Sequence, residues 1–444
     1  MCRPGVGAAA RGGDAREGLQ RGRVNPSNRL SPGAFVSSSS PARLAPNVPR
    51  FYAYSLLSTL SFWFPVAILY YQARGLNYGE IMLLVVVQSV FQFALEVPSG
   101  VVADTWGRKH ALVIAAVCKV VFLALFLVGN GLGVFVLASA VLGIHLAFES
   151  GSDSAFLYDT LKSLGREGEY REHEGRAWSY RLGSMGVGSL LGGAAAEVSL
   201  RLPVLLTLLG SAAALVVALT FREPPHHRST RDKPSVAHMR HAASVVWASG
   251  PLRYLVLFSG FMGAAMLTGF KFSQPYMHEA GVDLKFFGAI YFVWMLSSAV
   301  VARNTHRIVR WTGESLALLS IPVLLAAHYF FLAWSTSLAG VGVILISQLT
   351  SGLVRPLVND TLHKGIPSSH RATVMSFAGF FQSLVLMVLS PLFGVLADRH
   401  SMSAAFGAEG LFVVVAGVIP LALLAVHRPS PVPAITAEPR APTS

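Results

Sequence analysis

Three long apolar stretches of the sequence carry polar or ionisable side chains at the spacing of a helix. Residues three, four or seven apart lie on one helix face, so each set would form a polar stripe on an apolar helix. Such groups are costly to bury, and those that are buried are candidates for carrying protons or binding a charged ligand. The sets are His145, Glu149 and Asp153; Lys271, Gln274 and His278; and Gln348, Arg355 and Asn359.

The first set offers acid and base chemistry. Glu149 is expected to lie deep in its stretch, and burial allows a carboxyl group to take up a proton near neutral pH, so Glu149 is the candidate proton carrier. His145, on the same face, would relay the proton or only form a hydrogen bond. Asp153 is expected near the end of the stretch, where a structural ion pair is the simpler interpretation. Its candidate partners are Arg108, Lys109 and Lys162.

The other two sets add cations and amides. Lys271 and Arg355 would pair with the acids of the first set or meet an anionic substrate, and both alternatives stay open. Gln274 and Gln348 would supply hydrogen bonds, whereas His278 is expected at the surface. The candidate path for a proton or a substrate is therefore His145, Glu149, Lys271, Gln274, Gln348 and Arg355.

A charged loop, L-E-V-P-S-G-V-V-A-D-T-W-G-R-K, separates two apolar stretches. Gly100 would allow one helix to approach another closely, and Gly107 would allow a tight turn. Asp104 can sit against a helix N-terminus or pair with Arg108, interactions worth roughly 0.3 to 2 kcal/mol. Together with Lys109, these residues form either a conformational latch or a plain positively charged loop that fixes the topology.

The composition explains why charge inside these stretches matters. The chain has 444 residues, of which 53% are hydrophobic and 13% charged, whereas an ordinary soluble domain carries roughly 25% charged residues. Continuous apolar windows of about 20 residues recur, which is the length of a helix that crosses a hydrocarbon core of roughly 30 Å. We therefore expect an all-α polytopic membrane protein with twelve transmembrane helices. The expected spans are 51–71, 79–97, 110–128, 132–153, 177–197, 202–221, 253–275, 284–302, 314–334, 338–358, 372–396 and 403–427.

Loop charges predict the orientation, because Lys and Arg are retained on the cytoplasmic side of a membrane. One set of alternate loops holds most of these residues, and the other holds only Arg74, Arg201, Lys285 and Arg399. Both termini are therefore expected in the cytoplasm, with the chain in the cell membrane. The excess of Lys and Arg in these loops explains the formal charge of +13. Because the basic residues are distributed over many loops and form no single stripe, they argue against a nucleic-acid partner.

Polar regions flank and divide the spans. The N-terminal region is rich in Arg, Gly, Ser, Ala and Pro and lacks the apolar run of a signal peptide, so we expect it to be disordered. Cys2 and Cys118 lie in this tail and in a span, so no disulfide framework, metal cluster or other cofactor is expected. The expected segments are a tail at 1–50, a bundle at 51–221, a cytoplasmic linker at 222–252, a bundle at 253–427 and a disordered tail at 428–444.

The two expected bundles carry a related sequence at the same place. F-L-Y-D-T-L-K follows the fourth span and L-V-N-D-T-L-H-K follows the tenth, so Asp159 matches Asp360. This placement in corresponding loops indicates an internal duplication. Parallel six-helix repeats around an axis along the membrane normal are typical of one large class of secondary transporters. We therefore expect two pseudo-symmetric six-helix bundles.

The charged loop resembles the signature that the major facilitator superfamily carries between helices two and three. The matching residues are Gly100, Asp104 and Gly107 with the Arg-Lys that follows it. E-V-P-S-G before the loop and R-A-T-V-M-S at the start of span eleven resemble a widespread branch associated with drug efflux. The likeness covers residues 51–427 and implies a cavity lined by helices one, four, seven and ten, with alternating access by rocking. In relatives, the loop latches the bundles together on the cytoplasmic side.

The fifth span resembles a second signature, which many antiporters carry as Gly-Pro, two residues and Gly-Gly. It reads G-V-G-S-L-L-G-G, so Gly188, Gly192 and Gly193 match, but Ser189 replaces the proline and Ser184 an upstream glycine. Close helix packing is the alternative reason for these glycines. The departure weakens the prediction of antiport without removing it.

Transport by alternating access is the function that these features favour. No Gly-Lys-Ser or Gly-Lys-Thr occurs, so the phosphate loop of an ATPase is absent. The resemblance implies coupling to protons, for which Glu149 is the candidate carrier. Isolated histidines argue against a metalloenzyme. We expect a monomer that exports amphipathic compounds or drugs. Uptake of a small nutrient or organic anion, and a non-transporting receptor or scaffold, are the alternatives.

Overall fold

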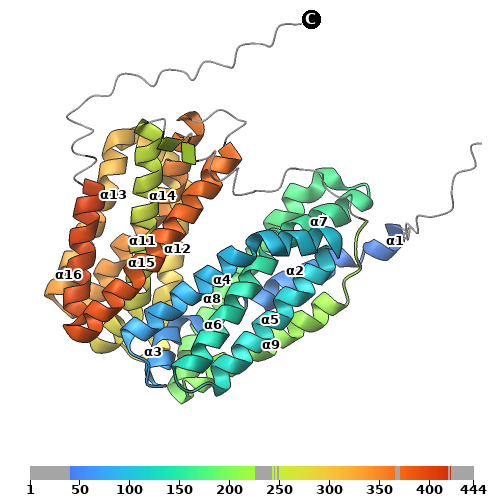
Figure 1. Ribbon diagram of the computed structural model, residues 1–444, viewed down its shortest axis with the longest axis horizontal. Coiled ribbons are helices and arrows are strands. Elements are labelled where there is room, and N and C mark those ends of the chain that lie inside the picture. Colours follow the sequence, from blue (N-terminus) through green and yellow to red (C-terminus); the bar gives the residue numbers. More distant parts are fainter. Residues whose placement is uncertain are drawn as a thin grey trace, which may run out of the picture. The chain divides into compact units, whose positions relative to one another are not determined.

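The computed structural model describes residues 41–225, 243, 244, 246, 247, 250–365, 371–418 and 421. These residues belong to one compact unit, and all regular elements within the described ranges are helices (Figure 1). Within the described part of the chain, ten helical segments are long and apolar enough to cross a membrane. Two further helices complete the twelve expected spans, so the all-α fold class is confirmed. They are α8 (Tyr170–Val198) and α16 (Met402–Val413), which η3 (Val414–Val418) continues.

The helices form two bundles, each packed around buried aromatic and aliphatic side chains. The first bundle consists of α1 (Pro41–Leu44), α2 (Asn47–Thr59), η1 (Phe64–Val66), α3 (Ala67–Gln72), α4 (Tyr78–Thr105), α5 (Arg108–Val128), α6 (Leu132–Glu149), α7 (Ser152–Ser163), η2 (Glu167–Glu169), α8 and α9 (Arg201–Leu219). The second consists of α11 (Gly250–Glu279), α12 (Leu284–Thr312), α13 (Glu314–Trp334), α14 (Leu338–Gly365), α15 (Arg371–Arg399), α16 and η3.

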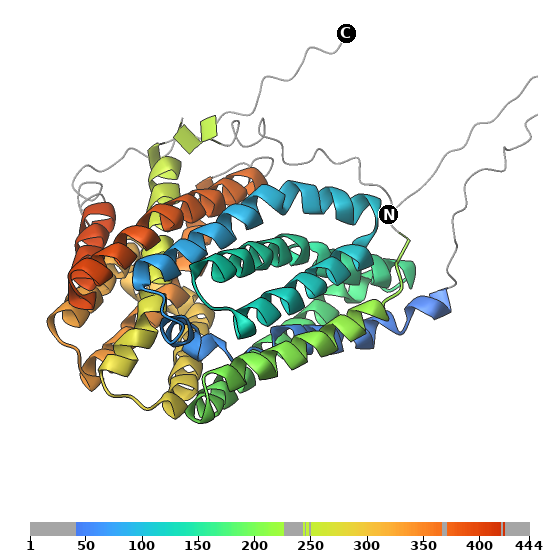
Figure 2. The same ribbon diagram turned by 60° about the horizontal axis from the view of Figure 1, so that its bottom comes forward.

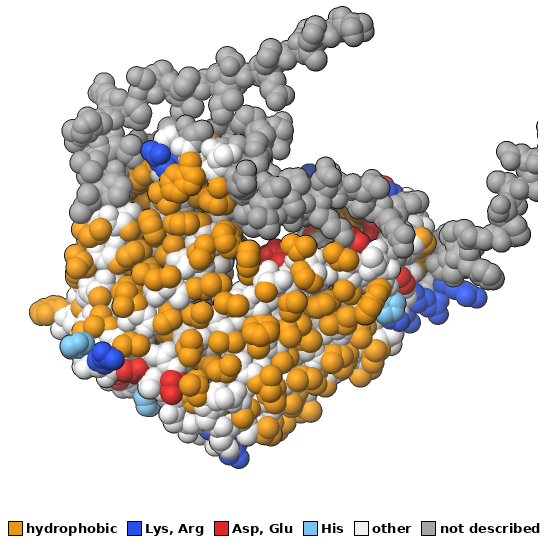
Figure 3. Space-filling view, viewed as in Figure 1, with side chains coloured by type: hydrophobic (Ala, Val, Ile, Leu, Met, Phe, Trp, Pro, Cys, Tyr) orange, Lys and Arg blue, Asp and Glu red, His pale blue; other side chains and the backbone are white. Residues whose placement is uncertain are grey.

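Apolar side chains cover the middle of the face shown in Figure 3, and charged side chains gather along its lower edge and at its right end. Lipid offers no hydrogen bonds, so a helix exposed to it must present apolar side chains and satisfy its own backbone. The bundles join mainly through two pairs of helices, α4 with α15 and α8 with α12, and α3 also contacts α11. Figures 1 and 2 both show α4 (blue) lying beside α15 (orange).

The first expected span, 51–71, is not one helix. It breaks between α2 and η1, where Phe62 N and Trp63 N donate to Thr207 Oγ1 at 3.0 and 3.3 Å. Pro65 lies in η1 and cannot donate a backbone hydrogen bond there. The irregular backbone is thus satisfied by a side chain of a neighbouring helix rather than by water, as membrane depth requires.

The fourth expected span, 132–153, is also divided. α6 ends at Glu149, and Gly151 then adopts a positive φ of 73° before α7 begins. Asp153 therefore lies in the first turn of α7, on a different helix from His145 and Glu149. The expected polar stripe is correct for His145 and Glu149 and wrong for Asp153, because the glycine turn redirects the chain.

The structure moves two expected boundaries. Asn47 lies in the segment expected as a tail, but it begins α2 and is completely buried. Its Nδ2 donates to Arg222 O at 2.7 Å, and Arg222 N donates to Asn47 Oδ1 at 3.0 Å. Asn47 and Arg222 therefore belong to the first bundle, since their reciprocal hydrogen bonds join α2 to the segment after α9. Residues 1–40, most of the expected linker and the expected tail at 428–444 lie outside the described residues.

Candidate transport site

Glu149 ends α6 with polar groups from two helices against its carboxylate. Tyr54 of α2 donates to Oε1 at 3.4 Å. His145 Nε2, one turn earlier on α6, lies 3.4 Å from Oε2. Tyr54 and His145 are buried, whereas the Glu149 side chain keeps 27% of its exposure. The carboxylate is therefore sheltered without being sealed from solvent.

The His145 ring determines how many protons this pair holds. Nδ1 lies 2.9 Å from Ala115 O, and a carbonyl oxygen only accepts, so this contact assigns the ring hydrogen to Nδ1. In the neutral ring, Nε2 is then an acceptor that faces a second acceptor, the Glu149 carboxylate. One added proton, on His145 or on Glu149, makes this approach favourable. The pair is therefore arranged to hold one exchangeable proton.

Lys119, on α5, adds positive charge beside this pair. Its Nζ donates to Ser58 O of α2, and the ammonium lies within electrostatic reach of Glu149. An ionised Glu149 is thus balanced by Lys119, which lowers the cost of a charge in a sheltered position. The cluster can therefore exist with or without the exchangeable proton.

Asp153 forms an ion pair, but with a partner other than those expected. Arg181 of α8 donates from Nη1 to Asp153 Oδ2 at 2.7 Å, and Nη2 lies 3.5 Å from Ser55 Oγ. The side chains of Arg181 and Asp153 keep only 15% and 12% of their exposure. The interpretation of Asp153 as a member of a structural ion pair therefore agrees with the structure. The candidate partners Arg108, Lys109 and Lys162 are wrong, because α7 turns Asp153 toward α8.

The expected path residues of the second bundle lie in different surroundings. Gln274 is buried and donates from Nε2 to Phe64 O at 2.9 Å, so it binds the broken backbone of span one. Lys271 is half-buried on α11, and among the described side chains it forms no ion pair. Gln348 is half-buried on α14. The side chain of Arg355 lies outside the described residues.

The expected latch residues find their described partners inside the first bundle. Arg108 Nη2 lies 2.8 Å from Asp104 Oδ1, and Arg108 Nε lies 3.9 Å from Asp159 Oδ2. Asp159 belongs to the duplicated sequence that follows the fourth span. Asp104 thus makes the expected pair with Arg108.

A residue outside the expected set binds the helix N-terminus in this loop. Glu223 accepts hydrogen bonds from Arg108 N at 2.7 Å and Lys109 N at 2.9 Å, where an anion is stabilised by the helix dipole. Gly107 has a φ of 107°, and a Cβ there would lie 2.3 Å from Glu223 Cδ. At Gly100, a Cβ would meet no described heavy atom within 4 Å. The close helix approach expected at Gly100 is therefore wrong for this conformation.

Two carboxylates join the bundles at the other end of α4. Asp398, at the end of α15, accepts from Tyr78 N at 2.8 Å and Gly79 N at 2.6 Å. Glu197, at the end of α8, accepts from Lys285 N at 3.0 Å. Each carboxylate therefore binds the N-terminus of a helix in the opposite bundle. We call this end of the molecule, defined by these five residues, the closed end.

The three expected packing glycines lie along α8. A Cβ at Gly192 would lie 2.0 Å from Phe62 O, and one at Gly188 would lie 2.9 Å from Ser61 N. A Cβ at Gly193 would lie 2.8 Å from a backbone oxygen of α12. These glycines let α8 approach both the break in span one and the second bundle.

Sequence reasoning missed Arg181 and left Lys119 without a role, although a signal for both was present. Each lies inside an expected span, at 177–197 or 110–128. An ionisable residue at membrane depth is a candidate by default, so the rule that selected Glu149 would also have selected them. Glu223 gave no such signal, because it lies in the polar segment expected as a linker.

The fold is that of a membrane transporter. The model of the Major Facilitator Superfamily matches residues 51–391, and the chain belongs to this family. A relative from Bacillus subtilis (strain 168), the uncharacterized MFS-type transporter YxaM, is 21% identical over 375 residues, which cover 82% of this chain and 92% of YxaM. The protein is therefore a multi-pass membrane protein of this superfamily.

Two solved structures share the fold. The nucleoside transporter NupG matches with a TM-score of 0.68 and 12% identity over 88% of this chain and 99% of NupG. A bacterial homologue of the human lysosomal transporter Spinster, in an inward-facing and unoccupied conformation, matches with a TM-score of 0.66 and 14% identity. That match covers 88% of this chain and 99% of the homologue.

Proposed function

We propose that this protein is a proton-coupled secondary transporter of the cell membrane that exports amphipathic small molecules by alternating access. The observation that carries the proposal is the pair of His145 and Glu149, in which two acceptors face each other unless a proton is bound. In this proposal, both termini are cytoplasmic and the closed end faces outward. The conformation is then the one that admits substrate from the cytoplasm.

Proton binding would change the charge that the cluster presents to a substrate. Tyr54, Lys119, His145 and Arg181 all act electrostatically on Glu149. Without the proton, the carboxylate attracts a cationic or polar amphipathic molecule, and with the proton it does not. Proton and substrate therefore compete for one site. Competition of this kind produces exchange when each releases the other on opposite sides of the membrane.

The latch proposal gains support from a repeated sequence. Gly394-Val-Leu-Ala-Asp398 at the closed end of α15 has the same pattern as Gly100-Val-Val-Ala-Asp104 at the other end of α4. Here Asp398 binds the N-terminus of α4, and a Cβ at Gly394 would lie 2.8 Å from Tyr78 O. We propose that Asp104 binds the N-terminus of α15 in the alternate state, where Gly100 would find its close contact.

Export can be tested in cells that lack their own efflux pumps. Wild type, Glu149→Gln and Glu172→Gln are expressed at equal abundance, and retention of cationic, neutral and anionic dyes is measured with and without a protonophore. Glu172 is the matched control because it is 61% exposed and pairs with Arg176. We expect lower retention for wild type and the control only, abolished by the protonophore. Retention equal to that of empty cells contradicts export, and insensitivity to the protonophore contradicts proton coupling.

Transport of an organic anion is the second candidate, and Lys271 favours it. This half-buried lysine on α11 forms no ion pair with a described side chain, and a sheltered ammonium without a counter-ion is costly. An anionic substrate would supply that counter-ion. In the dye assay, an effect confined to anionic dyes and lost in Lys271→Gln supports this candidate.

A further inference from the structure

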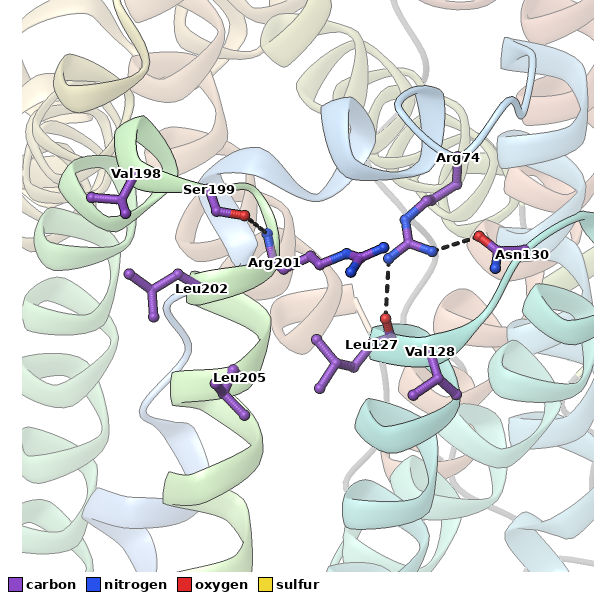
Figure 4. Close-up of a pocket in the computed structure, with 9 residues that line it drawn as sticks. All are labelled: Arg74, Leu127, Val128, Asn130, Val198, Ser199, Arg201, Leu202 and Leu205. Atoms are coloured by element: carbon purple, nitrogen blue, oxygen red, sulfur yellow. Dashed lines mark hydrogen bonds between the residues drawn. The ribbon is translucent and has the colours of Figure 1, made fainter.

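A pocket of about 620 Å³ lies at the closed end of the first bundle. It is formed where α5 ends and α9 begins, with contributions from the segments after α3 and α8 (Figure 4). Its upper rim is polar and its remaining walls are apolar. The lining residues are Arg74, Leu127, Val128, Asn130, Val198, Ser199, Arg201, Leu202 and Leu205.

Arg74 is held in a fixed position at this pocket. Its Nη1 donates to Gly129 O at 2.8 Å and to Asn130 Oδ1 at 2.6 Å. Its Nη2 donates to Tyr70 OH at 2.8 Å and to Leu127 O at 3.1 Å. The guanidinium is therefore organised in advance by the loop after α5, so little entropy is lost when a ligand binds beside it.

Arg201 brings a second guanidinium to the same place. Figure 4 shows its side chain pointing toward the guanidinium of Arg74, and both groups act electrostatically on Tyr70. Among the described residues, no carboxylate or other acceptor pairs with the Arg201 guanidinium. Two like charges that face one another are unfavourable unless an anion lies between them. The Arg201 guanidinium can bind a phosphate through paired hydrogen bonds. Arg74 contributes its positive charge, because its Nη groups already donate four hydrogen bonds.

The apolar walls of the pocket indicate what the anion is attached to. Val128 and Val198 keep 70% and 78% of their exposure, and Leu205 keeps 39%. In a membrane protein, such side chains at the ends of spanning helices face lipid. A free inorganic anion gains nothing from these walls, whereas the acyl chains of a phospholipid pack against them. The charged rim and the apolar walls of the pocket therefore match a phospholipid whose headgroup lies at the rim and whose acyl chains lie against the walls.

We propose that this pocket binds an anionic phospholipid of the leaflet at the closed end, with its phosphate between Arg74 and Arg201. An arginine at the end of a membrane helix pairs with the phosphate of an acidic headgroup through charge-assisted hydrogen bonds. The lipid joins the ends of α5, α8 and α9 and thereby stabilises the first bundle in the conformation described. This site is independent of the proposed substrate and of proton coupling.

The test uses the full chain in detergent, with lipid binding counted by native mass spectrometry. The probes are dioleoyl-phosphatidylglycerol, dioleoyl-phosphatidylcholine and soluble glycerol phosphate. The variants are Arg201→Ala, which removes the unpaired guanidinium, and Val128→Glu, which places a negative charge at an exposed position of the apolar wall. Arg399→Ala is the matched control, because Arg399 is an exposed arginine at the closed end of α15. Unfolding temperatures without lipid show that each variant is folded.

We expect wild type and Arg399→Ala to prefer phosphatidylglycerol over phosphatidylcholine by about fivefold, the effect of about one well-placed arginine. Arg201→Ala and Val128→Glu are expected to bind the two lipids equally. A preference that survives in both variants overturns the proposal. Competition by glycerol phosphate as strong as that by the lipid also overturns it, since the site would then bind a free anion.

Discussion

His145 and Glu149 show how far helical spacing predicts a site at the scale of residues. The spacing of four was enough to place both side chains on one face, because α6 stays regular up to Glu149. The hydrogen bond from His145 Nδ1 to Ala115 O comes from α5, and spacing along one helix carries no information about it. The facing acceptors on which the proposed proton site rests therefore became visible only in the structure.

Replacement of Tyr54 by Phe tests the environment of Glu149. Tyr54→Phe removes the hydroxyl that donates to Oε1 at 3.4 Å and keeps the ring. A donor to a carboxylate favours its ionised form, so its loss favours protonation at higher pH. We expect the pH midpoint of transport to rise by up to about one unit, equivalent to about 1.4 kcal/mol. Tyr329→Phe, which alters a buried hydroxyl of the second bundle, serves as the control, and a midpoint that stays or falls contradicts the expectation.

The Arg181–Asp153 pair is predicted to stabilise the first bundle mainly by avoiding an unpaired buried charge. Removal of one partner of a buried pair typically costs about 3 to 5 kcal/mol, whereas removal of both costs less. Arg181→Gln alone should therefore lower the unfolding temperature more than Arg181→Gln combined with Asp153→Asn. Thermal unfolding in detergent measures both. Additive losses would show that the two side chains act independently.

At the scale of elements, the sequence predicts where spans lie better than where they break. Hydropathy cannot detect the turn at Gly151, since apolar residues precede it and a helix follows it. The break in span one depends on Thr207, which lies on α9, far away in the sequence. Both breaks result from tertiary contacts or local dihedral angles, which a hydropathy window does not contain.

The close contact between α8 and span one provides a matched pair of glycine variants. A Cβ at Gly192 would lie 2.0 Å from Phe62 O, whereas one at Gly183 would meet no described heavy atom within 4 Å. Gly192→Ala is expected to cost about 1 to 3 kcal/mol through overpacking, seen as an unfolding temperature lower by several degrees. Gly183→Ala, on the same helix, should be neutral or slightly stabilising. Equal effects of the two substitutions would mean that the approach at Gly192 is not tight.

At the scale of the whole molecule, duplication in the sequence predicted the two six-helix bundles, but not which end would be closed. The positions of Asp398 and Glu197 supply that information, because each binds the N-terminus of a helix in the opposite bundle. The repeated pattern at Gly100 and Gly394 then indicates where the alternate state would close. The sequence contains the pattern for closure at both ends of the molecule. A single conformation shows closure at only one of them.

Substitutions at the two ends should therefore shift the conformational equilibrium in opposite directions. Asp398→Asn weakens the closed end, and Asp104→Asn weakens the proposed closure at the other end. A helix cap contributes about 0.5 to 2 kcal/mol, so each substitution should shift the populations by about two- to thirtyfold. The reporter is Leu69→Cys in a background with Cys2→Ser and Cys118→Ser, which removes both native cysteines. Leu69 suits this purpose because it is 7% exposed and packs within the core of the second bundle. Labelling should accelerate with Asp398→Asn and slow with Asp104→Asn, and shifts of the same sign would refute opposed latches.

The proton held by His145 and Glu149 is most directly tested by measuring proton and substrate movement together. Wild type and Glu149→Gln are reconstituted into vesicles that contain a pH-sensitive dye, and a substrate from the dye panel is added. For wild type, we predict proton flux opposite to substrate flux, and for Glu149→Gln at least a tenfold loss of proton flux. Substrate movement without proton movement in wild type, or undiminished proton flux in Glu149→Gln, would contradict proton coupling at this pair.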